Sequence, residues 1–149
     1  MSSKHAWHAA GLLAAVVLPL AACGTAPAPE LASPAKIVPI TGSNIPRLEL
    51  TPSAVNRLGI QTQPVMAAAP GAAGATEVIP YPAVVYDTDG SSWAYVAVAP
   101  GTYVRRPISI TVIRGDVALL SGGPPVGARV VTVGTAELLG TEYNISGEQ

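Results

Sequence analysis

After one uninterrupted apolar run at residues 9–18, the chain alternates between apolar and polar positions in a series of short stretches. Strand-like stretches with turn signals between them follow at intervals of about ten residues, and short strands at this spacing are typical of antiparallel β-barrels and sandwiches. The pattern therefore predicts a mainly β fold, a small antiparallel β-barrel or β-roll. Its expected strands cover 47–50, 60–66, 78–86, 92–98, 102–114, 117–120 and 129–133.

One segment carries helix signals at both ends. Thr51 can cap the first turn, Pro52 suits the first helical position, and Gly59 can end the helix in the left-handed conformation. The sequence therefore predicts a short helix over 52–58. A single helical turn is expected at 135–139.

Turn residues separate the predicted strands. The Asp-Thr-Asp-Gly sequence at 87–90 predicts a hairpin between the strands on either side of it. The stretch 102–114 is expected to be either one strand or a bent pair broken at Pro107, because proline cannot donate to a sheet ladder. A last short strand is expected within 141–149.

Two segments read as connections. Residues 23–44 are rich in proline and alanine, which predicts a flexible tether that would span roughly 60 Å if extended. The β-domain is then expected over 45–146. Within it, the Ala/Gly-rich stretch 67–76 is interpreted as a flexible link.

The apolar run leads into Leu20-Ala21-Ala22-Cys23, which resembles the lipobox of a bacterial lipoprotein signal. The resemblance implies a signal peptide over 1–22, a lipid on Cys23 and a place on the cell membrane, facing the periplasm or the extracellular side. Membrane lipid would then be the first partner. An ordinary secretory signal and a retained membrane helix stay open as alternatives.

Charge adds little to this picture. Eight basic and nine acidic residues give a formal net charge of −1, so no basic surface is expected for nucleic acid. Arg105 and Arg106 form the only adjacent basic pair. We interpret them as a solvated strand end, with a phosphate or partner contact as the alternative.

The side chains of common catalytic and metal sites are scarce. Both histidines and the single cysteine lie in residues 1–23, and the carboxylates are scattered. The acids Asp87 and Asp89 resemble the opening of a calcium loop, but the twelfth position, which needs a glutamate, is Val98. We therefore expect no enzyme activity, no catalytic residues, no metal and no cofactor.

The aromatic residues allow two interpretations. Trp93 and Tyr95 share one face of a predicted strand, and burial in the core is expected of them because aromatic side chains carry much of the buried area. The alternative is a ligand pocket lined by Trp93, Tyr95 and Tyr103.

The second half of the chain resembles the C-terminal region of the HlyD-like periplasmic adaptors, also called membrane fusion proteins, of efflux systems. The resemblance rests on Ile-Pro-Tyr-Pro-Ala-Val-Val-Tyr-Asp at 79–87 and Trp-Ala-Tyr-Val at 93–96, followed in order by short motifs near 103–108, 115–116, 121–122, 127–134 and 137–138. Residues 50–65, with Arg-Leu-Gly-Ile-Gln-Thr at 57–62, also resemble an early stretch of heavy-metal-type adaptors.

The chain departs from that family in one respect. Adaptors carry a lipoyl-like domain and a long helical hairpin between these two regions, where this chain has only 67–76. The resemblance therefore implies the membrane-proximal β-domain alone, which would bind or regulate an inner-membrane transporter permease without catalysis and could self-associate. The expected partner-binding residues are Arg105, Arg106, Ser121 and Gly122. The alternative function is a ligand-binding or envelope-structural lipoprotein with no transport role.

Overall fold

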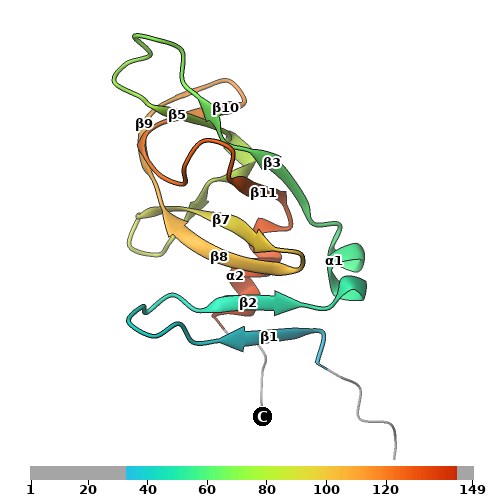
Figure 1. Ribbon diagram of the computed structural model, residues 1–149. Coiled ribbons are helices and arrows are strands. Elements are labelled where there is room, and N and C mark those ends of the chain that lie inside the picture. Colours follow the sequence, from blue (N-terminus) through green and yellow to red (C-terminus); the bar gives the residue numbers. More distant parts are fainter. Residues whose placement is uncertain (1–32, 144–149) are drawn as a thin grey trace, which may run out of the picture. The chain divides into compact units, whose positions relative to one another are not determined.

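The computed structural model describes residues 33–143, and these residues form two antiparallel β-sheets with two short α-helices (Figure 1). The predicted mainly β fold is confirmed. In place of the expected small barrel or roll, the strands form two open sheets, sheet A and sheet B. The strands of sheet A are β1 (Ala35–Val38), β2 (Arg47–Leu50), β3 (Gln61–Pro64), β6 (Val85–Tyr86), β7 (Ser92–Ala99), β8 (Thr102–Pro107) and β11 (Arg129–Val133).

Sheet A interleaves the two ends of the described chain. Its strand order is β1-β2-β8-β7-β11-β3, with the short β6 also paired to β7. Leu48 of β2 lies opposite Tyr103 of β8, and Thr62 of β3 lies opposite Val131 of β11. Early strands therefore pair with late ones on both sides of β7.

The edge strand β1 corrects the expected tether. Ala35 pairs with Leu50 of β2, and the half-buried Ile37 packs against the core. Pro34 and Pro39 flank the strand, where a missing N–H costs no ladder hydrogen bond. The tether over 23–44 was thus predicted too long, because four residues between prolines gave little pattern. The β-domain begins before β1 rather than at residue 45.

Sheet B has the order β4-β5-β10-β9, formed by β4 (Met66–Ala67), β5 (Glu77–Pro80), β9 (Ser109–Arg114) and β10 (Val117–Gly122). Strands β8 and β9 belong to different sheets, so of the two alternatives for 102–114 the structure shows the pair broken at Pro107. Strands β4 and β5 form a hairpin. Its loop is most of the predicted link, closed by a 2.9 Å hydrogen bond from the Ala68 N–H to the Thr76 carbonyl.

The first helix, α1 (Pro52–Leu58), has the predicted ends. Thr51 Oγ1 accepts a 3.2 Å hydrogen bond from the Ala54 N–H, Pro52 occupies the first turn, and Gly59 is left-handed with φ 63°. A 3₁₀ turn, η1 (Tyr81–Ala83), follows β5, so the predicted strand 78–86 is divided into β5, η1 and β6.

The second helix, α2 (Thr135–Glu142), is longer than the predicted turn at 135–139. It covers the start of the stretch expected as a last strand, so that expectation is wrong for Thr141 and Glu142. Residues 144–149 lie outside the described part. Leu138 is fully buried beneath the helix, and this contact stabilises α2 although Gly140 disfavours helix.

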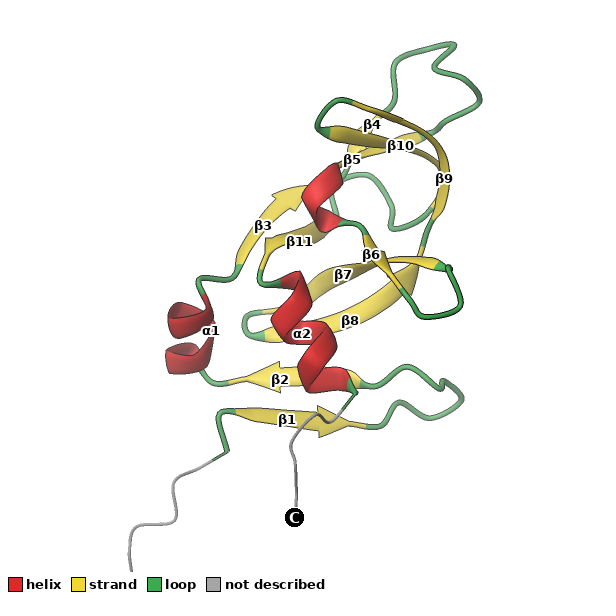
Figure 2. Ribbon diagram, turned by 180° about the vertical axis from the view of Figure 1, so that it is seen from behind, coloured by secondary structure: helices red, strands yellow, loops and turns green. Residues whose placement is uncertain are grey.

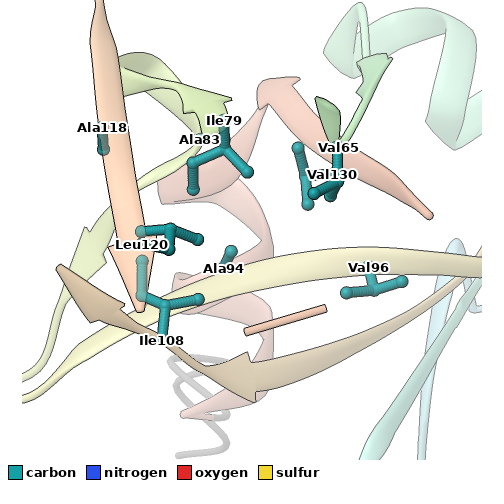
Figure 3. Close-up of a cluster of buried hydrophobic side chains, with 9 residues drawn as sticks. All are labelled: Val65, Ile79, Ala83, Ala94, Val96, Ile108, Ala118, Leu120 and Val130. Carbon is teal, nitrogen blue, oxygen red and sulfur yellow. The ribbon is translucent and has the colours of Figure 1, made fainter. Parts of the chain in front are cut away.

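Two apolar clusters hold the layers together. Figure 3 shows the first, which joins sheet B to one face of β7 and β11; it consists of Val65, Ile79, Ala83, Ala94, Val96, Ile108, Ala118, Leu120 and Val130. The second lies on the opposite face of sheet A, where α1 and α2 pack. It consists of Leu48, Leu50, Ala54, Val85, Tyr95, Tyr103, Val131 and Leu138. Both faces of the central strands are therefore covered.

Candidate functional site

The adjacent arginines of β8 lie on opposite faces of sheet A, because side chains alternate along a strand. Arg106 is exposed, as expected of a solvated strand end. Arg105 is only 5% exposed, so its interpretation as part of a solvated strand end is wrong. Its face of the strand is the one that α2 covers, as Figure 2 shows.

Arg105 bridges a turn and the last helix. Its Nη1 atom lies 2.7 Å from Oδ2 of Asp87, and its Nη2 atom lies 2.8 Å from Oε1 of Glu142. Tyr95 donates a 2.6 Å hydrogen bond to Glu142 Oε2, and Tyr143 donates one of 2.7 Å to Asp87 Oδ1. We call these five residues the Arg105 cluster.

The turn before β7 orients the aromatic neighbour of this cluster. Gly90, with φ 83°, donates to the Asp87 carbonyl and closes the predicted turn. Asp89 accepts from the Ser91 hydroxyl at 2.6 Å, and that hydroxyl accepts from the indole N–H of Trp93 at 2.7 Å. The Trp93 ring then lies 4.5 Å from Cζ of Arg105, within cation–π distance.

Contacts within the Arg105 cluster shift the pKa values of Asp87, Tyr95 and Arg105. The hydrogen bonds from Tyr143 and Arg105 lower the pKa of Asp87 from 3.8 to about 2. Burial, followed by the hydrogen bond to Glu142, raises the pKa of Tyr95 well above its usual value. Burial lowers the pKa of Arg105, but Asp87 and Glu142 outweigh it and raise the pKa overall. All three shifts move the pKa away from neutral pH, where a general acid or base titrates. The ion pair between Arg105 and Glu142 fastens α2 to sheet A.

The three aromatic residues of the alternative ligand pocket belong to the core. Tyr95 is fully buried, Tyr103 is 3% exposed, and Trp93 is half-buried against the second apolar cluster. The prediction of a core position is confirmed for Tyr95, whereas Trp93 packs half-buried against the same core.

A groove of about 630 Å³ opens on the other face of sheet A, between β7, β8 and the segment that follows β10. We call it the Arg106 groove. Its walls are largely apolar, and they bring together two of the predicted partner-binding residues, Arg106 and Gly122. The complete lining is Val96, Val98, Arg106, Pro107, Ser109, Gly122, Gly123, Pro124, Pro125 and Ala128.

The other two predicted partner-binding residues lie apart from this lining. Ser121 is exposed at the end of β10, next to Gly122, and its hydroxyl is 3.4 Å from the Ser109 carbonyl. Arg105 belongs to the opposite face. Ser121 and Gly122 end a strand rather than starting the loop that their sequence predicts.

Backbone hydrogen bonds fix the wall formed by the segment after β10. Val65 donates to the Ala128 carbonyl at 2.7 Å and accepts from the Gly127 N–H at 2.9 Å. Pro124 is buried. The groove is therefore formed without a partner, as binding sites commonly are.

Within residues 33–143 the structure contains no group of three or more side chains that could hold a metal ion. In the same part of the chain, no helix has both the length and the hydropathy needed to cross a membrane. The signal peptide at 1–22 and the lipidation site Cys23 lie outside the described residues.

Sequence reasoning missed the Arg105 cluster because its partners are remote in the chain. Asp87 and Glu142 approach Arg105 only after β7, β8 and α2 have packed. One signal was present: Arg105 is in phase with Tyr103, two positions earlier in β8, and Tyr103 is a core residue.

Comparisons with protein-family models, with curated proteins and with solved structures found no match for this chain.

Proposed function

We propose that the chain is a lipid-anchored, non-catalytic protein of the cell envelope that binds an inner-membrane transporter of the efflux class. In this proposal Cys23 carries the lipid, and the β-domain corresponds to the membrane-proximal domain of a periplasmic adaptor. The observation that carries the proposal is the Arg106 groove, where Arg106 and Gly122 meet on a fixed, accessible surface.

The β4–β5 hairpin supports the likeness to adaptors. In that family the lipoyl-like domain and helical hairpin would lie between the regions that match residues 50–65 and 79–87. Here the chain leaves sheet B at Ala67 and re-enters at Glu77, opposite it in the ladder. A β-domain that lacks the insertion is thus closed by a short loop.

The Arg105 cluster supports a binding role over an enzymatic one. Its two carboxylates accept hydrogen bonds from an arginine and two tyrosine hydroxyls, and the pKa of Asp87 is lowered to about 2, far from the neutral range in which a general acid or base works. The groove lies on the opposite face, and Arg106 is the one charged residue in its lining.

Site-specific photo-crosslinking in native membranes tests the proposal. A crosslinking amino acid at Arg106 or Ser121 of the full-length, lipid-anchored protein should capture an inner-membrane transporter subunit, identified by mass spectrometry. The same probe at Arg57, exposed on α1, should not. Capture of only the protein itself or of cell-wall proteins would refute transporter binding and favour the envelope-structural alternative.

Lipid anchoring has its own test. Labelled palmitate should be incorporated into the wild-type protein and not into Cys23→Ser. Equal labelling of the two proteins would contradict lipidation at Cys23.

A further inference from the structure

We propose that the Arg106 groove binds an extended peptide segment of the partner, with apolar side chains and one carboxylate that pairs with Arg106. This inference rests on the proposed function in that it requires a protein partner, but it does not depend on which protein that is. The charge of the groove, its walls and the sheet edge beside it each specify part of this occupant.

The charge of the groove specifies a carboxylate. Arg106 is the one charged residue in a lining of valine, proline, glycine, serine and alanine. Within residues 33–143 it makes no ion pair and no side-chain hydrogen bond, unlike Arg105 and Arg47. A guanidinium beside apolar walls binds a carboxylate through two parallel hydrogen bonds, which a neutral group cannot replace.

The walls specify apolar neighbours for that carboxylate. Val98 is 50% exposed where it faces the groove, although it lies in the central strand β7. Pro107, Pro124 and Pro125 line the groove without offering a backbone N–H. Apolar side chains on either side of the acidic residue would cover this surface and strengthen the ion pair by excluding water.

The neighbouring strand specifies an extended conformation. Ser109 lines the groove and begins β9, which is the edge strand of sheet B. An edge strand presents backbone N–H and C=O groups that no neighbouring strand pairs. A peptide that lies in the groove can continue along β9 as an added strand, a common mode of peptide recognition.

Selection from a displayed library of random peptides, on the full-length protein in detergent, tests this inference. We expect enriched sequences with Asp or Glu between apolar residues. Arg106→Gln should weaken their binding about tenfold, because a charge-assisted pair is lost. Arg106→Glu should instead enrich peptides that carry Lys or Arg. Arg57→Gln removes the same charge from an exposed position of α1, away from both the groove lining and β9, and should change binding less than about twofold.

Three outcomes would overturn the inference: no enriched peptides, enrichment without acidic residues, or equal binding by the Arg106 and Arg57 variants. Enriched acidic peptides together with a failed transporter crosslink would instead retain the groove and refute the transporter. The two proposals can thus fail separately.

Discussion

At the scale of single residues, Arg105 places a guanidinium between sheet A and the last helix, where it faces two carboxylates. Glu142 and Arg105 each have a side-chain exposure of 5%. Three charges in so enclosed a place cost solvation free energy, which ion pairs and the hydroxyls of Tyr95 and Tyr143 offset. The arrangement stabilises the fold only while every member keeps its partner.

Replacing Arg105 by glutamine is therefore expected to lower the free energy of unfolding by about 3 kcal/mol, because Glu142 loses its counter-charge in a buried site. Urea unfolding followed by circular dichroism measures the change. Arg106→Gln is the control in the next residue of the same strand, and it should alter stability by less than about 0.5 kcal/mol. Equal effects of the two substitutions would contradict the role of the Arg105 cluster.

The lowered pKa of Asp87 predicts how stability responds to acid. A carboxylate whose pKa falls from 3.8 to about 2 on folding stabilises the folded state above its unfolded pKa and loses that contribution as the pH falls toward 2. The wild-type urea midpoint should fall between about pH 5 and pH 2. Asp87→Asn should be less stable at neutral pH and should approach the wild type at pH 2. Parallel pH profiles for the two proteins would show that Asp87 does not titrate in this way.

At the scale of elements, the turn between β7 and β8 packs directly on β2. Gly101 is left-handed with φ 69°, and its carbonyl accepts a 2.8 Å hydrogen bond from the Leu50 N–H. A Cβ atom at Gly101 would lie 2.6 Å from the Leu50 carbonyl oxygen. Glycine is thus required there for both its conformation and its size.

Gly90 provides a matched comparison, because it is also left-handed, with φ 83°, but has no atom within 4 Å of an added Cβ. Gly90→Ala should lower the free energy of unfolding by about 1 kcal/mol through backbone strain alone. Gly101→Ala should lower it by about 2 kcal/mol more, because β2 and the turn must also move apart. The difference between the two variants in urea unfolding measures the packing of the turn. Equal losses of unfolding free energy in the two variants would mean that the turn moves away from β2 without destabilising the fold.

The elements that could be predicted from the sequence are those with local signals. The ends of α1 depend on Thr51, Pro52 and Gly59, which act within one turn of the helix. The bend at Pro107 depends on a single missing N–H. In contrast, β1 is a strand because β2 lies beside it, and α2 extends to Glu142 because Leu138 is buried.

The candidate sites were harder to predict from the sequence, because they too depend on contacts between segments that are remote in the chain. Arg106 and Gly122 were predicted as surface residues that contact a partner, and the structure places both on one groove. The neighbouring Arg105 was grouped with them, because an adjacent pair of arginines does not show which face of the strand each one takes. That assignment depends on α2, which lies more than thirty residues further along the chain.

At the scale of the whole molecule, sheet A depends on the late strands. The early β2 pairs with β8, and the early β3 pairs with β11. A chain ended after Leu120 would lack β11 and α2, so β3 would have no partner strand and Arg105 would lack Glu142. We expect this truncated chain to lack cooperative urea unfolding and to be cleaved rapidly by protease at concentrations that the full chain resists. A cooperative transition in the truncated chain would contradict the interdependence of the early and late strands.

The interleaving of sheet A also sets when the chain can fold. The residues that separate Leu50, at the end of β2, from Thr102, at the start of β8, take about 3–10 seconds to synthesise at roughly 5–20 residues per second. Contacts between remote strands also form slowly once both strands are present. For several seconds after β2 has been made, the chain therefore has no complete sheet A.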